Sequence, residues 1–247
     1  FAEPKIGFPL AVADRMRGFP QQAERFFMIQ QRSPTRDAWW ACAQSEAWLA
    51  DPKGQPVKPL ATCAAAGAKP HLDGRLDEAF WANAKPAKLA SAARDDGDWP
   101  ATVKLAHDAE FLYLGIECRR PPGVEPPAAS GPRPRDGDLS ARDRVDVLVD
   151  LDRDYVTYYR LTIDDRGWTA EDCWGDGSWN PEWFVAVDAK DGVWTAEAAI
   201  GLDQLTGRYP TARDVWTLGL QRVVPGVGFQ SWTTPASTAI TPEGFGL

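Results

Sequence analysis

Alternation of apolar and polar residues with a period of two runs through residues 103–224 and constrains the fold most strongly. Residues 103–107 and 112–118 alternate on either side of an Asp108-Ala109-Glu110 turn, which predicts a β-hairpin. The pattern recurs between turn residues at 145–151, 159–163, 168–174, 183–188, 193–200, 215–224 and 230–233. Repeated strands without long helices between them predict a mainly β protein with an antiparallel β-sandwich, and argue against an α/β fold.

The first fifty residues follow a helical pattern instead. Apolar residues at helical spacing follow Pro20, and they recur after the Ser33-Pro34-Thr35 break until Asp51-Pro52. These features predict a short helical hairpin within residues 1–51, similar to the last unit of a tetratricopeptide-like array. One hairpin cannot bury its own apolar face. We therefore expect it to pack on the sandwich or on residues outside this sequence.

Two segments are expected to be largely irregular. Residues 52–68 are rich in Pro, Ala and Gly and are typical of a connector, with room for one short strand around residues 60–63, so the sandwich is expected over residues 69–247. Residues 121–138 are rich in Pro and Gly and have no apolar periodicity, which predicts a long exposed loop.

Composition argues against several classes of function. With 35 acidic and 27 basic side chains the net charge is −8, so no nucleic-acid partner is expected. No window approaches the roughly 18 apolar residues of a membrane span. The chain lacks G-x-S-x-G, H-E-x-x-H and nucleotide-loop motifs and has 2 histidines, so we do not expect an enzyme. A glycosidase, which needs only two carboxylates, stays open.

The sequence offers few side chains that could hold a metal ion or a cofactor. Cysteines 42, 63, 118 and 173 show no C-x-x-C spacing, so zinc is not expected, while a Cys42–Cys63 disulfide stays open. Asp150, Asp152 and Asp154 have the D-x-D-x-D spacing of calcium loops, but Tyr155 stands where such loops have glycine. No cofactor is therefore certain, and calcium stays open. Both methionines lie in the helical part, which argues against haem.

Residues 70–81 contain the sequence L-D-G-x-L-D-E-x-x-W, and residues 106–114, 143–150 and 194–200 follow in a recognisable order. Together these segments resemble the family-nine carbohydrate-binding modules and their DOMON-like relatives over residues 69–247. The resemblance implies a non-catalytic module that tethers a larger, exported protein to a glycan. It also implies an extracellular, periplasmic or cell-envelope location.

The resemblance further implies a site on the concave face of the sandwich. In such modules two tryptophans hold the end of a polysaccharide or oligosaccharide, and acidic, amide and arginine side chains select its hydroxyls. The matching polar residues here are Asp143, Asp146, Arg160 and Gln221. Asp146 and Arg160 are expected to form either a hydroxyl-reading pair or a cross-strand ion pair. Glu197 and Arg222 are expected to form a structural pair.

The tryptophan positions of the family are occupied here by Leu139-Ser140 and Ala239-Ile240. The chain nevertheless has 12 tryptophans, which fit either a thick core or a stacking platform. Trp174, Trp179 and Trp183 surround a Gly-rich loop, so they form either a substitute platform or the edge of the core. Trp174 and Trp179 therefore join the candidate ligand-binding residues. The alternative function is a structural or protein-interaction β-sandwich that has lost the sugar site.

Overall fold

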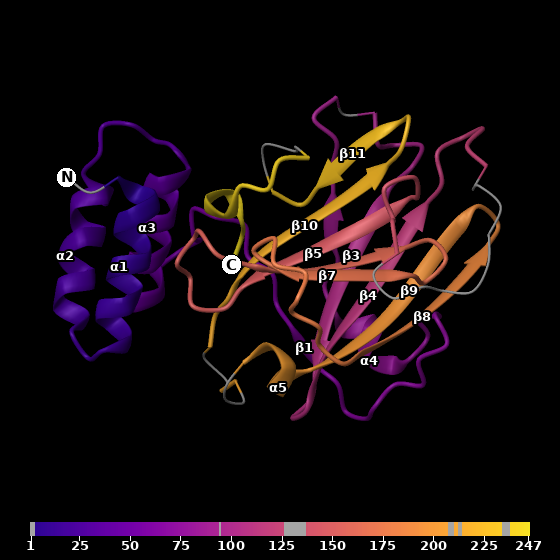
Figure 1. Ribbon diagram of the computed structural model, residues 1–247, viewed down its shortest axis with the longest axis horizontal. Coiled ribbons are helices and arrows are strands. Elements are labelled where there is room, and N and C mark those ends of the chain that lie inside the picture. The colour runs from indigo at the N-terminus through magenta and orange to yellow at the C-terminus, as the bar shows by residue number, and fades with distance from the viewer. Residues whose placement is uncertain (1–2, 94, 126–136, 207–209, 212–213, 234–237) are drawn as a thin grey trace.

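The structure is a computed structural model that describes residues 3–93, 95–125, 137–206, 210–211, 214–233 and 238–247. Figure 1 shows a group of helices at one end of the molecule and a β-sandwich at the other. Most of the loop predicted at 121–138 lies outside the described residues. Within the described part, no helix is both long and apolar enough to cross a membrane.

The helical unit contains α1 (Pro4–Met16), α2 (Pro20–Gln31) and α3 (Ala38–Ala50). Helices α2 and α3 match the two predicted from spacing, whereas α1 was not predicted. Its sequence holds Gly7 and Pro9, which are poor helix formers, so packing must stabilise it. Gly7 allows that packing, because a Cβ atom there would lie 2.3 Å from the Phe26 ring.

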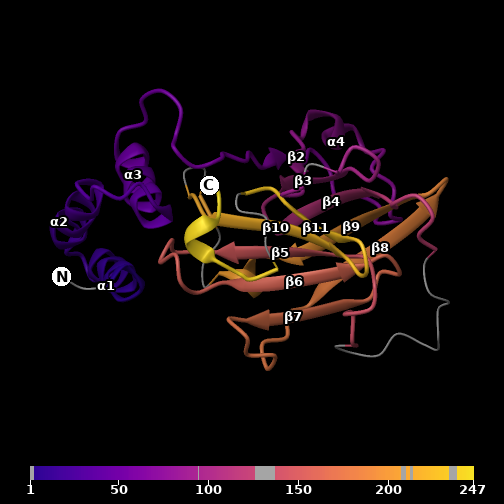
Figure 2. The same ribbon diagram turned by 90° about the horizontal axis from the view of Figure 1, so that it is seen from above.

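The sandwich consists of two sheets packed face to face (Figure 2). The β4 sheet has the order β1-β3-β4-β9-β8, with β2 also paired to β3. Its strands are β1 (Ala64–Ala65), β2 (Ala87–Leu89), β3 (Ala101–His107), β4 (Phe111–Arg119), β8 (Trp183–Lys190) and β9 (Val193–Gly201). The β5 sheet has the order β11-β10-β5-β6-β7. Its strands are β5 (Arg144–Asp150), β6 (Tyr159–Asp164), β7 (Thr169–Cys173), β10 (Thr217–Val224) and β11 (Gly228–Ser231).

Short helices α4 (Ala79–Asn83) and α5 (Leu202–Leu205) and the 3-10 helix η1 (Pro242–Gly244) complete the elements. Apart from the parallel β1–β3 pair, the described strand pairs are antiparallel. The predicted antiparallel β-sandwich is therefore confirmed.

The Arg222 guanidinium on β10 is fully buried between the two sheets. Its Nε and terminal NH2 donate to the two carboxylate oxygens of Asp143 over 2.8 and 2.7 Å. The Trp194 indole also donates to Asp143 over 2.8 Å. The predicted Glu197–Arg222 pair is wrong, because β9 and β10 belong to different sheets and Glu197 faces away from the space between them.

The L-D-G-x-L-D-E-x-x-W sequence surrounds Glu197 on the outer face of the β4 sheet. One Glu197 oxygen accepts from the backbone N–H groups of Asp73 and Gly74, each over 3.1 Å, and the other accepts from the Trp81 indole over 3.0 Å. Gly74 has φ +86°, and a Cβ atom there would lie 2.4 Å from the Asp188 nitrogen. Only glycine fits such a position. These motif residues therefore organise the packing of the sandwich.

The buried Glu197 carboxyl makes the stability of the fold depend on pH. Burial and the neighbouring Glu78 carboxyl raise the pKa of Glu197 from 4.5 to about 7. The second oxygen of Glu78 is buried and meets no hydrogen-bond donor among the described residues. Since the folded pKa exceeds the unfolded one, this contribution to stability is complete below pH 4.5 and is lost as pH rises through about 7.

Glu78→Gln should reduce this pH dependence, because it removes the neighbouring carboxyl that helps burial to raise the pKa of Glu197. We expect the wild type to lose on the order of 1–3 kcal/mol more stability than this variant between about pH 5 and about pH 8. Urea denaturation at both pH values measures the difference, and exposed Glu117→Gln is the matched control. Equal pH slopes for Glu78→Gln and the wild type would show that Glu78 does not raise the pKa of Glu197.

Tyr155, from the loop between β5 and β6, joins the sandwich to the helical unit. Its ring is fully buried and lies edge-on to Phe8, with 5.2 Å between ring centroids. Its hydroxyl donates to Glu46 on α3 over 2.8 Å, and Arg153 and Arg15 donate to the same carboxylate, each also over 2.8 Å. Of the two partners expected for the helical segment, the structure shows the sandwich.

Candidate functional site

A row of polar side chains crosses the outer face of the β5 sheet. Strand register places Ser231, Gln221, Asp146 and Thr162 side by side on β11, β10, β5 and β6. The Gln221 amide donates to one Asp146 oxygen over 2.8 Å, and the Thr162 hydroxyl donates to the other over 2.7 Å. Two of the predicted ligand-binding residues therefore lie together.

This row offers little to a ligand. Asp146 is 4% exposed and Gln221 is 8% exposed, and both Asp146 oxygens already accept hydrogen bonds. The predicted pairing of Asp146 with Arg160 is wrong. The register places Arg160 opposite Leu148 and Asp172, one row further along the sheet. There the Arg160 Nε donates to the Asp172 carboxylate over 2.5 Å.

The C-terminal segment covers the β10 end of this face. A pocket of about 20 Å³ lies under it, which is room for about one water molecule. Its lining comes from Leu148, Gly219, Leu220, Gln221, Ser231, Thr233, Ala239, Ile240, Thr241 and Phe245. Ala239 and Ile240 stand where the resemblance places the second tryptophan. At the other tryptophan position, Leu139 is buried.

Two further predicted residues take part in packing. Asp143 pairs with the buried Arg222 guanidinium on the inner side of the sheet. Trp179 packs against the core, and its ring centroid lies 4.7 Å from that of Tyr159. Trp183 also packs against the core, and its indole donates to Glu171 over 3.3 Å. Contacts inside the protein therefore explain the positions of Asp143, Trp179 and Trp183, and no ligand is needed to explain them.

An open polar and aromatic surface remains at the β6–β7 edge of the sheet. Trp174 follows β7, is 60% exposed, and donates its backbone N–H to the Tyr158 carbonyl over 2.8 Å. The Arg160 side chain is 39% exposed and keeps further N–H donors beyond its pair with Asp172. The sequence analysis did not name Asp172, which pairs with Arg160 at this edge. The signal for Asp172 was its place two residues before Trp174, on the strand beside Arg160.

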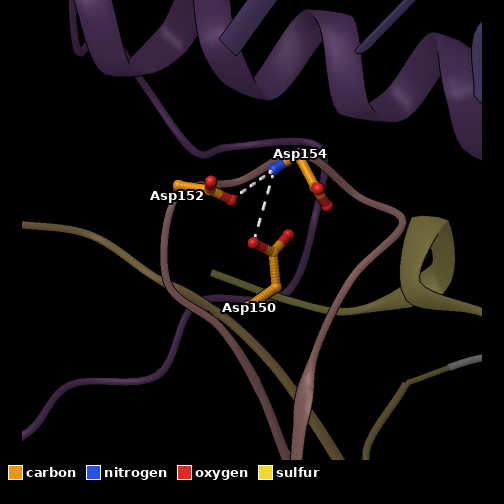
Figure 3. Close-up of side chains that lie close together, drawn as sticks. All are labelled: Asp150, Asp152 and Asp154. Carbon is orange, nitrogen blue, oxygen red and sulfur yellow. Dashed lines mark hydrogen bonds between the residues drawn. The ribbon is translucent and has the colours of Figure 1, made fainter. Parts of the chain in front are cut away.

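The three acidic residues with calcium-like spacing form the loop that carries Tyr155 (Figure 3). Asp150, Asp152 and Asp154 each place a carboxylate oxygen within 4.8 Å of the others. Asp150 accepts from three backbone N–H groups of the loop and from the Thr217 hydroxyl. Burial and the nearby Asp154 carboxylate raise the pKa of Asp150 to about 7. The spacing thus serves a tight loop, and calcium stays a prediction.

The structure does not contain the Cys42–Cys63 disulfide that the sequence left open. All four are free: Cys42 is buried in the helical unit near Lys58, whereas Cys63 is exposed. Burial raises the pKa of the Cys42 thiol to about 12, which keeps it protonated at neutral pH. Cys118 is buried in the sandwich core as expected.

No protein-family model matches the chain, and no curated protein matches it either. Solved structures do match. A carbohydrate binding module family 9 from Caldicellulosiruptor kristjanssonii in complex with cellotriose is 16% identical over 74% of this chain and 89% of that chain, with a TM-score of 0.53. The sandwich has a family 9-like fold. The DOMON-like and tetratricopeptide-like resemblances stay predictions.

Two further structures have the same family 9-like fold. A family 9 module from the same organism in complex with glucose is 15% identical over 76% of this chain and 93% of that chain, with a TM-score of 0.52. A Bacteroides uniformis protein named as a candidate carbohydrate-binding protein is 12% identical over 75% and 95%, with a TM-score of 0.53. Such likeness establishes the fold, while the ligand must be argued from the site.

Proposed function

We propose that this chain is a non-catalytic carbohydrate-binding module that tethers a larger, exported protein to a glycan. The observation that carries the proposal is the exposed Trp174 beside the partly exposed Arg160 on a family 9-like sandwich. An indole face stacks on the C–H face of a pyranose, and a guanidinium donates to its hydroxyls. Neighbours with this fold are described in complex with cellotriose and glucose, which supports a sugar ligand.

The non-catalytic part of the proposal rests on the carboxylates of the same face. Asp146 and Asp172 both accept hydrogen bonds from neighbouring side chains and are buried. General acid–base chemistry needs carboxylates that reach the substrate. An extracellular or periplasmic location is part of the proposal, because a glycan tether acts outside the cytoplasm.

One observation favours the alternative, a structural or protein-interaction sandwich. The two positions where the resemblance places tryptophans hold Leu139, which is buried, and Ala239-Ile240, and the pocket beside Ala239-Ile240 has room for about one water molecule. If the β6–β7 edge does not bind sugar either, the fold serves packing against other domains.

Calorimetric titration with glucose, cellotriose and longer oligosaccharides, with calcium and with a chelator, separates the two functions. We expect a dissociation constant between about 1 μM and about 1 mM for at least one glycan. Arg160→Ala should weaken binding about tenfold, because a charged donor is lost. Arg75→Ala, an exposed arginine paired with Asp188 on the other sheet, should bind like the wild type. Absence of binding to every sugar under both conditions would leave the structural alternative.

A further inference from the structure

Trp174 lies in a turn that rarely accepts a bulky residue. Cys173 and Asp176 close a two-residue hairpin, each donating its backbone N–H to the carbonyl of the other over 3.1 and 2.9 Å. The two residues between them, Trp174 and Gly175, have φ +51° and +85°. A type I′ turn needs these positive angles and normally has Asn-Gly or Asp-Gly. A tryptophan here adopts a backbone conformation disfavoured for large L side chains.

Packing does not compensate for this conformation. Trp174 is 60% exposed, although an indole is among the largest apolar surfaces a residue can bury. Within the described part of the chain, the ring stacks on no other aromatic ring or cation, and its indole N–H makes no hydrogen bond. Strain and exposure both disfavour tryptophan at this site, which indicates a role outside the stability of the fold.

One carboxylate fixes the turn relative to Arg160. Asp172 is 8% exposed; its Oδ1 accepts from the Gly175 N–H over 2.7 Å, and its Oδ2 accepts from the Arg160 Nε over 2.5 Å. The indole and the guanidinium are therefore held on neighbouring strands at a set spacing. Because Asp172 neutralises Arg160, the pair offers hydrogen-bond donors without a net positive charge. This combination suits a neutral sugar better than an acidic one.

We infer that Trp174 is a single stacking platform that, with Arg160, binds a neutral glucose-like unit within a glycan chain. The inference rests on the proposed function. Strand β7 is the edge of its sheet, so a chain lying on Trp174 can continue in both directions. The tryptophan pair that would enclose a chain end is replaced by the buried Leu139 and by Ala239-Ile240, and the pocket beside Ala239-Ile240 has room for about one water molecule. Glucose-like rings suit the platform, because equatorial hydroxyls leave C–H bonds on both faces.

Trp174→Asn tests the inference, because it places the preferred residue in the turn while removing the indole. We expect a higher thermal midpoint than the wild type and binding to cellohexaose weakened at least about tenfold. Phe184→Thr removes an exposed aromatic ring from the other sheet and should bind like the wild type. Cellohexaose whose reducing end has been converted to the alditol should bind the wild type within about twofold of the free sugar, because the platform does not read a chain end.

Each other outcome is decisive. If the wild type binds no glycan, the proposed function fails and the inference fails with it. If the wild type binds and Trp174→Asn binds equally well, or Trp174→Asn is less stable than the wild type, Trp174 is a packing residue and the inference alone is wrong. If reduction of the sugar end abolishes wild-type binding, the site reads chain ends, and the single-platform arrangement is overturned.

Discussion

Asp143→Ala is expected to lower the free energy of unfolding by about 3–5 kcal/mol, because it leaves a buried guanidinium without its counter-charge. Arg222 is fully buried between the sheets, and two of its three nitrogens donate to Asp143. Its remaining partners are the backbone carbonyls of Trp99 and Arg119, which carry no charge. Guanidinium chloride denaturation at neutral pH, with an unchanged m-value, measures the loss.

Glu110→Ala is the control for this experiment, because it removes an ion pair to Lys69 in which both side chains are more than half exposed. Such pairs contribute less than about 1 kcal/mol. The double variant Asp143→Leu with Arg222→Met should recover part of the stability, since a buried charge pair can be exchanged for apolar side chains. If Asp143→Ala costs no more than Glu110→Ala, the pair does not organise the core.

Glu46→Ala should detach the helical unit from the sandwich. It removes the acceptor of Arg15, Arg153 and the buried Tyr155 hydroxyl, so we expect a loss of about 2–4 kcal/mol in the docking of the two units. The β5–β6 loop should then exchange its amide hydrogens faster, because Tyr155, which has a positive φ of 59°, loses its side-chain contacts with the helical unit. Hydrogen exchange of this loop is the measurement.

The matched control is Glu24→Ala, an exposed glutamate on α2 that makes no contact with the sandwich in the described residues. It should leave loop exchange unchanged. If Glu46→Ala also leaves it unchanged, the helical unit is not held by this carboxylate and packing of Phe8 on Tyr155 must suffice.

The strands could be predicted from the sequence because one face of each is apolar, and period-two alternation reports that directly. Register could not. Asp146 and Arg160 both belong to the outer face, but the pairing of β5 with β6 offsets them by one row, so each finds a different partner. Helix α1 was not predicted, because its residues Gly7 and Pro9 are poor helix formers. Packing against Phe26 stabilises the helix.

The sequence predicted where the candidate site lies better than it predicted which residues form it. Position in the family motif cannot distinguish a carboxylate that faces ligand from one that pairs inside, and Asp143 pairs inside. Three neighbouring tryptophans look alike in the sequence, yet Trp179 and Trp183 pack on the core while Trp174 stands on a hairpin turn. The acidic loop looked like a calcium site because tight turns and metal sites both use closely spaced carboxylates.

If a glycan binds at the β6–β7 edge through Trp174, the indole N–H signal of Trp174 in ¹H–¹⁵N NMR spectra should report the binding. Trp174→Asn assigns the signal, because the spectrum of that variant lacks it. On titration with cellohexaose we predict a shift of the Trp174 signal, while the Trp81 and Trp194 signals, whose indoles bond to Glu197 and Asp143 inside the protein, stay in place. A Trp174 signal that does not move while sugar binds would contradict the account.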